Sequence, residues 1–251
     1  RVLDGILNRN ISLQTLDGIL CHNGEFAMQE YRPSKMGDFE SFDKKYEECY
    51  VDEKAIGRLV PYTLEACVVR ICDMIAYLGK DRQDAKRANL IKDDGIFDEQ
   101  TFGKSNPEII NNLIVNIVEN SYGKDCILMD DEYYKAIKAT KKENYKKIYF
   151  NEALDQTYEN CVRPMVHQMY DKLLLDLQSG DRNSIIYKHH VDFVKENTSY
   201  YGNDDYLERT EENQIVVDFI ASMTDDYFVD LYEYLFPKSR YQIKYVSYFE
   251  N

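Results

Sequence analysis

The longest regular pattern of apolar residues lies in residues 63–84. No proline or glycine interrupts it before Gly79, and its apolar positions recur at three- and four-residue spacing: Leu64, Val68, Ile71, Ile75 and Leu78. This spacing is typical of a helix that buries one broad face. We therefore predict a long central helix here, with Thr63 as its N-cap.

Helical spacing continues through most of the remaining chain, and strand-like alternation is confined to the tail at residues 241–251. Further helices are predicted at residues 106–120, 130–149 and 151–180, the last with a candidate break at Pro164. A helix pair is predicted at 211–235, and two short helices within residues 2–21. Residues 30–57 are polar and irregular, so we expect a loop with one short helix at 39–49. The pattern predicts an all-α fold.

Composition fits a globular protein and narrows its partners. The chain has 251 residues, of which 44% are hydrophobic and 30% charged. No apolar run approaches the ~20 residues that a membrane span needs, so we expect no membrane association. The net charge of −14 argues against general nucleic-acid binding, although it allows a local basic pocket for a small polyanion.

Cysteine usage points to a reducing compartment. The six cysteines form no C-x-x-C pair and no zinc-finger spacing. Reduced thiols of this kind are typical of the cytoplasm, which we take as the expected location.

A polar stripe runs along the otherwise apolar central helix. Asp73, Tyr77 and Asp81 are spaced four residues apart and therefore share one face. A carboxylate among apolar neighbours costs several kcal/mol, roughly, unless a cation or hydrogen bonds compensate it. The stripe is thus either a site or a structural feature, in which Asp73 pairs with a core arginine or lies at a solvated seam.

Positive charge is concentrated in residues 135–147, which contain six lysines and one glutamate. Lys138, Lys141, Tyr145 and Tyr149 recur at helical spacing and can form one face. This pattern suits an anionic ligand, because lysines act as point charges for phosphates. A solvated face near a helix C-terminus would show the same pattern.

Three segments resemble a known family and follow its order. The sequence CDMIAYLGKDRQDA at residues 72–85 is similar to the last metal-ligand helix of the HD-superfamily deoxynucleoside triphosphate triphosphohydrolases, the dGTPase-like enzymes. Residues 145–151 (YKKIYFN) resemble that family's segment around its substrate-facing tyrosine. Residues 216–237 (VVDFIASMTDDYFVDLYEYLFP) resemble its C-terminal signature.

The resemblance implies a role for each matched residue. Asp73 would be the final metal ligand, and Tyr77, Asp81 and Tyr149 would contact the deoxyribose, where a tight fit disfavours a 2′-hydroxyl. Lys141 stands where the family often has a phosphate-facing arginine, and its single ammonium lacks the bidentate fork. Tyr145 stands where some members have a histidine. Further candidates near the pocket are His22, Glu25 and Lys138.

The metal ligands mark a departure from the family. The family holds a divalent metal, such as Mg²⁺ or Mn²⁺, with a His, an adjacent His-Asp pair and a distant Asp. Upstream of Asp73 this chain has one histidine, His22, followed by Asn23. One Asp and one His do not make a divalent-metal site. We expect the chain to be the C-terminal portion of a larger enzyme, whose metal needs ligands from elsewhere.

The implied activity is metal-dependent hydrolysis of a deoxynucleoside triphosphate to the deoxynucleoside and tripolyphosphate. The implied fold is an HD-like helical bundle with extra C-terminal helices. Residues 1–150 would be the remainder of the catalytic domain, and 151–251 a helical region with oligomer contacts, in keeping with a homo-oligomer. The alternative is a non-catalytic module that binds nucleotide or mediates oligomerisation and regulation.

Overall fold

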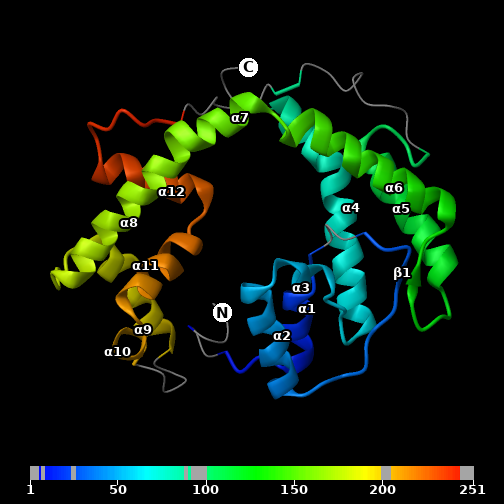
Figure 1. Cartoon of the computed structure of the whole chain (residues 1–251), viewed down its shortest axis with the longest axis horizontal. Coiled ribbons are helices and arrows are strands. Elements are labelled where there is room, and N and C mark those ends of the chain that lie inside the picture. Colours follow the sequence, from blue (N-terminus) through cyan, green and yellow to red (C-terminus); the bar gives the residue numbers. More distant parts are fainter. Residues whose placement is uncertain are drawn as a thin grey trace. The chain divides into compact units, whose positions relative to one another are not determined.

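The computed structural model describes residues 6, 9–23, 27–87, 90–91, 101–198 and 205–243. These residues are mostly helical (Figure 1), which confirms the predicted all-α fold. Strand structure in the described ranges is limited to a two-residue pair that the sequence did not reveal. In it, β1 (Glu30–Tyr31) runs antiparallel to β2 (Ile127–Leu128), with Glu30 opposite Leu128. No helix in these ranges has the length and apolarity needed to cross a membrane.

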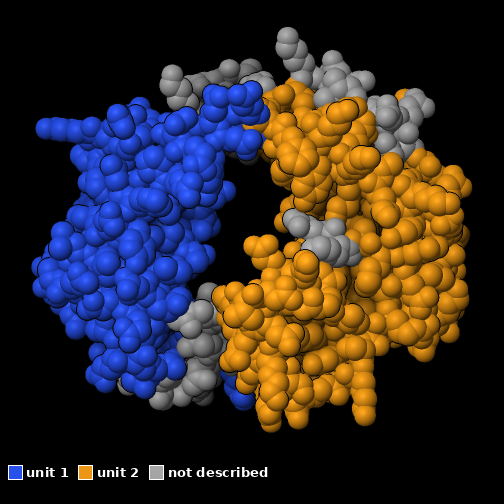
Figure 2. Space-filling model, in the orientation of Figure 1, with its two compact units in different colours: residues 1–11, 152–251 blue, residues 12–151 orange. Residues whose placement is uncertain are grey.

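The chain forms two compact units, which Figure 2 distinguishes by colour. Unit 2 comprises residues 12–151, and unit 1 comprises residues 152–251 together with residues 1–11. Each unit has its own cluster of buried apolar side chains.

Unit 2 is built around α4 (Leu64–Arg87), which corresponds to the predicted central helix. The Thr63 hydroxyl accepts a hydrogen bond from the Ala66 amide at 3.2 Å, as expected of an N-cap. The other helices of the unit are α1 (Leu13–Leu20), α2 (Phe39–Val51), α3 (Glu53–Gly57), α5 (Asn106–Ser121) and α6 (Asp131–Asn144). Residues 30–57 thus contain more helix than their polarity suggested.

The core of unit 2 lies where α4 packs against α5 and α6. Ile71, Ile75 and Leu78 are buried there with residues of both neighbouring helices, as their spacing predicts. Val68 is 43% exposed, so its predicted place in the buried face was wrong. Cys67 and Arg70 are buried instead, and the Arg70 guanidinium donates to the Leu59 carbonyl at 2.5 Å.

A glycine allows the start of α5 to approach α4 closely. A Cβ atom on Gly79 would stand 3.1 Å from both Cα and Cβ of Asn106 and would also meet its side-chain oxygen. The α5 backbone is fixed at this point by a capping box between Ser105 and Glu108, with Pro107 in the first turn. Neither helix can therefore move aside at low cost.

Helix α1 is anchored by a buried carboxylate. The Asp17 side chain is fully buried and accepts hydrogen bonds from the Lys45 ammonium at 2.5 Å and from the Tyr62 amide at 2.7 Å. Lys45 also donates to the Val60 carbonyl at 3.1 Å. Since these partners come from α2 and from the segment before α4, the network ties the N-terminal helices of unit 2 together.

Unit 1 contains the C-terminal helices. The predicted helix over residues 151–180 is divided into α7 (Glu152–Thr157), a π-helical turn (Tyr158–Val162) and α8 (Arg163–Gln178). The remaining helical elements described in this unit are a second π-helical turn (Tyr187–Val191), α9 (Asp192–Thr198), α10 (Tyr206–Arg209), α11 (Glu212–Ala221) and α12 (Asp225–Leu235).

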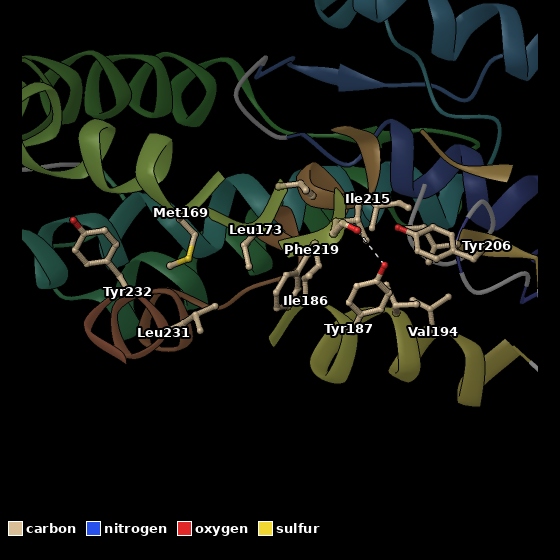
Figure 3. Packing of buried hydrophobic residues seen from close by; sticks show 14 of the residues in the cluster. Met169, Leu173, Ile186, Tyr187, Val194, Tyr206, Ile215, Phe219, Leu231 and Tyr232 are labelled. Carbon is tan, nitrogen blue, oxygen red and sulfur yellow. Dashed lines mark hydrogen bonds between the residues drawn. The ribbon is translucent and has the colours of Figure 1, made fainter. Parts of the chain in front are cut away.

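The unit 1 core combines α8 with residues from the helices that follow it. Figure 3 shows Met169 and Leu173 of α8 in the same cluster as Ile215 and Phe219 of α11. The Tyr187 hydroxyl donates to the Leu177 carbonyl at 3.2 Å, which satisfies a polar group inside this cluster.

A buried polar chain crosses the same core. The Tyr206 hydroxyl donates to Asp218 at 3.0 Å and lies 2.9 Å from Nε2 of His190. Because that hydroxyl proton is used on Asp218, the His190 ring donates to the Tyr206 oxygen through Nε2–H. Burial lowers the pKa of His190 to about 4, with Asp218 opposing the shift, so this histidine is a neutral structural residue near pH 7.

The close contact of α4 with α5 gives a stability test. We expect Gly79→Ala to lower the free energy of unfolding by about 1–3 kcal/mol, because the added methyl group forces the two helices apart. The matched control is Gly18→Ala, whose Cβ would meet the Ala66 Cβ at an ordinary 3.4 Å. That variant should be neutral or gain up to about 1 kcal/mol from helix propensity. Urea denaturation of both measures the difference, and an equal effect would contradict the packing described.

Candidate functional site

A cleft of about 510 Å³ lies within unit 2 and is bordered by the two segments that carry the predicted site residues. Helix α4 contributes one wall. The end of α6 and the π-helical turn Tyr145–Tyr149 contribute the other. His22 and Asn23, which follow the C-cap of α1, complete the lining of the cleft. The lining residues are His22, Asn23, Asp73, Met74, Tyr77, Leu78, Asp81, Lys141, Asn144, Tyr145 and Tyr149.

Two buried polar residues hold the walls of this cleft together. The Arg82 guanidinium on α4 donates through Nε to the Asn144 side-chain oxygen on α6 at 2.9 Å. The Asn144 amide in turn donates to the Leu78 carbonyl at 3.0 Å. Arg82 also pairs with Glu143 at 3.3 Å, with both side chains nearly buried. The spacing of the walls is thus set by hydrogen bonds that solvent cannot replace without cost.

One part of the cleft joins a carboxylate to a tyrosine. Burial raises the pKa of Asp81, while a hydrogen bond from the Tyr149 hydroxyl lowers it. The nearby Asp84 raises the pKa further, and the Lys141 ammonium lowers it. Asp81 and Tyr149 therefore act as one hydrogen-bonding pair, which can offer both an acceptor and a hydroxyl to a ligand.

Aromatic rings gather in and beside the cleft. Tyr145 and Tyr149 lie with ring centroids 5.3 Å apart, and Phe150 lies 6.2 Å from Tyr145. Tyr77 on the opposite wall is 58% exposed, and Phe150 is 78% exposed. Large exposed rings beside a polar cleft suit the flat face of a sugar or base. The π-helical turn is what presents Tyr145 and Tyr149 here, and such turns are frequent at functional sites.

The lysines of α6 fall into different environments. Lys141 is half-buried and lines the cleft. Lys135 pairs with Asp131 of the same helix, and Lys147, which lies in the π-helical turn after α6, pairs with Glu143 of α6. Lys138, a further candidate from the sequence, is exposed over the Tyr134 ring at 5.4 Å and is not among the cleft residues.

The described residues do not by themselves fit a divalent cation. Asp73 lines the cleft, but no group of three or more His, Cys, Asp or Glu in the described ranges is arranged to hold a metal. The predicted candidate Glu25 lies outside the described residues. Oxygen and imidazole donors are the right chemistry for such a metal, but a stable site needs more of them than this part of the chain brings together.

Sequence reasoning missed the residues that shape the cleft. Arg82 and Asn144 occupy positions where helical spacing alone calls for apolar side chains, Arg82 coming four residues after Leu78. A long polar residue at a helix position that faces the core indicates a hydrogen bond or ion pair with a neighbouring helix, but it does not identify the partner residue.

The C-terminal signature has a visible structural role in unit 1. The Thr224 hydroxyl accepts from the Tyr227 amide and caps α12, and Asp225 and Asp226 occupy its first turn, where the helix dipole favours negative charge.

Curated proteins of three bacteria match the chain. Each is named Deoxyguanosinetriphosphate triphosphohydrolase-like protein. The protein of Caldanaerobacter subterraneus subsp. tengcongensis is 26% identical over 181 residues, covering 71% of this chain and 48% of that protein. The Desulfatibacillum aliphaticivorans protein is 21% identical, covering 94% and 59%, and the Pelagibacter ubique protein is 27% identical, covering 88% and 61%.

The chain is a distant relative of these proteins. The resemblance found in three short segments is thereby confirmed as a distant similarity to proteins of this name. The chain spans about half to three-fifths of the length of the relatives it matches. No family model matches the chain, and no solved structure matches it.

The hydrogen bond between Tyr149 and Asp81 gives a pH test. Removal of the hydroxyl in Tyr149→Phe should raise the pKa of Asp81 further, because burial is then less opposed. A carboxyl whose native pKa exceeds its unfolded value binds protons preferentially in the native state. The free energy of unfolding therefore falls as pH rises from the pKa of Asp81 in the unfolded chain toward its pKa in the native protein. The variant should widen this pH range, because it raises the native pKa further.

Carboxyl ¹³C chemical shifts of labelled Asp, followed with pH, measure this change directly. Tyr77→Phe is the matched control, since Tyr77 lines the same cleft and does not contribute to the shift of Asp81. Identical Asp81 titration in the wild type and in Tyr149→Phe would show that the hydrogen bond is absent.

Proposed function

We propose that this chain supplies the deoxynucleoside triphosphate-binding part of a triphosphohydrolase. The whole enzyme would convert the nucleotide, dGTP or a similar one, to the deoxynucleoside and tripolyphosphate. The observation that carries the proposal is the single cleft lined by six residues that resemble the family's site: Asp73, Tyr77, Asp81, Lys141, Tyr145 and Tyr149. The relatives' printed names support the same substrate class.

The sugar would bind at the Asp81–Tyr149 pair. Asp81 can accept a hydrogen bond from the 3′-hydroxyl, and the Tyr149 ring can pack on the ribose face. Because Tyr149 is held by its own hydrogen bond, its ring is a fixed wall rather than an adaptable one. A fixed wall disfavours an additional 2′-hydroxyl, which supports a preference for deoxyribose.

The phosphates would be held by charge. Lys141 lines the cleft and lies on the wall opposite α4. It is a half-buried ammonium, so solvent screens its charge less than that of exposed Lys142 on the same helix. A triphosphate can replace part of the hydration that Lys141 has already lost.

The described residues supply only part of the ligand set for the metal that the resemblance implies. Asp73 is the one matched ligand, and the described residues contain no set of three. Hydrolysis would therefore need ligands from residues outside these ranges or from another polypeptide. This observation also favours the second candidate, a module that binds nucleotide without hydrolysing it.

Calorimetric titration with dGTP tests the binding function. We expect Lys141→Met to weaken the binding of dGTP by at least about tenfold, in line with a charge-assisted hydrogen bond worth about 1.5–3 kcal/mol. Deoxyguanosine, which lacks phosphates, should bind both proteins alike. Lys142→Met removes an exposed lysine that does not line the cleft and should leave dGTP affinity unchanged.

Release of tripolyphosphate from dGTP, with Mn²⁺ or Mg²⁺, then separates the two candidates. Release that Asp73→Asn abolishes supports the enzyme, and tight dGTP binding without release supports the binding module. Equal losses in Lys141→Met and Lys142→Met, or no binding of any deoxynucleoside triphosphate, would contradict both.

A further inference from the structure

His22 is presented to the cleft by a rigid support. It follows Cys21, a nearly fully buried residue whose amide donates to the Asp17 carbonyl at 2.8 Å at the end of α1. Asp17 is itself held by Lys45 and by the Tyr62 amide. The imidazole therefore begins one residue after an anchored helix end, although His22 itself is exposed.

A backbone contact fixes the ring. Nδ1 of His22 lies 2.7 Å from the Ile19 carbonyl oxygen. A carbonyl can only accept, so Nδ1 carries the proton and Nε2 points to the other side of the ring. Orienting one ring nitrogen on a carbonyl in this way is how proteins prepare the other nitrogen for a ligand.

The position of His22 along the cleft can be located from its neighbours. It borders a second hollow together with Thr63, Ala66 and Val69, which belong to the start of α4, and it borders the cleft together with Asp73. Asp81 is eight residues further along α4, about 12 Å away along the helix axis. His22 is thus at the Asp73 end, whereas the Asp81–Tyr149 pair marks the other.

We infer that His22 binds the phosphate chain of the ligand through Nε2. The inference rests on the proposed function: a sugar at Asp81 and Tyr149 leaves the phosphates to extend toward Asp73. Nε2 can donate to a phosphate oxygen when the ring is charged and accept from a phosphate hydroxyl or water when it is neutral. The charged groups that share its two hollows are Asp73, Asp81, Lys141 and Glu65.

Two substitutions distinguish the roles of the two ring nitrogens of His22. His22→Asn places an amide nitrogen where Nδ1 stands, so the contact with Ile19 is kept and the ligand-facing nitrogen is lost. His22→Gln does the reverse. We expect tripolyphosphate, titrated without metal, to bind about tenfold more weakly to His22→Asn, and within about threefold of the wild type to His22→Gln. A merely structural role would give the opposite order.

Nitrogen chemical shifts of ¹⁵N-histidine protein provide a readout independent of affinity. The chain has four histidines, and His189 and His190 in unit 1 serve as internal references. The neutral ring of free His22 should be the Nδ1–H tautomer, and tripolyphosphate should shift its Nε2 signal more than its Nδ1 signal.

The outcomes distinguish this inference from the proposed function. Unchanged tripolyphosphate affinity in His22→Asn, beside a loss of dGTP affinity in Lys141→Met, would overturn the role of His22 and leave the proposed function standing. If the wild type bound neither tripolyphosphate nor dGTP, both the role of His22 and the proposed function would be overturned.

Discussion

The hydrogen bond between Arg82 and Asn144 is the interaction on which the candidate site depends. It joins α4 to α6 at 2.9 Å inside the protein, and Asn144 extends the link back to the Leu78 carbonyl. Both side chains are more than nine-tenths buried. Loss of one partner would leave a buried guanidinium or amide without compensation, at about 1–3 kcal/mol or more for the charged group. The link therefore fixes the distance between the walls as well as stabilising them.

A second polar anchor fixes the N-terminal side of the same unit. Asp17 is fully buried and is satisfied by Lys45 and the Tyr62 amide, so α1 cannot slide along α4 without breaking an ion pair. The two anchors act on different edges of the cleft. One positions Lys141 and Tyr149 relative to Asp81, and the other positions His22 near Asp73. Apolar packing alone would allow small shifts at both edges, whereas directional hydrogen bonds do not.

The sequence predicted the helices well where apolar spacing was long and regular. The central helix is Leu64–Arg87, and the helix expected over 106–120 is Asn106–Ser121. Val68 was misplaced because spacing defines a stripe but not its edges, and Arg70 fills the buried position two residues later. The two-residue strands β1 and β2 left no periodic signal, since pairing between residues 96 and 98 positions apart depends on tertiary contacts.

The candidate site was predictable in its residues but not in its assembly. The stripe of Asp73, Tyr77 and Asp81 follows from four-residue spacing on one helix, and Lys141, Tyr145 and Tyr149 follow from the same spacing on another. The hydrogen bond between Arg82 and Asn144 decides how the two stripes face each other across the cleft. The sequence alone does not show that these two residues are in contact. Lys138 shares the spacing of Lys141 yet lies over Tyr134, because the rotation of α6 is set by its packing.

The most direct test of this account is the affinity for dGTP of the Asn144→Leu variant, measured by calorimetry on protein whose helical circular dichroism matches the wild type. The leucine fills the space of the amide but cannot join α4 to α6. We predict at least a tenfold loss of affinity, while Asn111→Leu, an exposed change on α5, leaves affinity unaltered. Wild-type affinity in Asn144→Leu would contradict the claim that this buried link assembles the cleft.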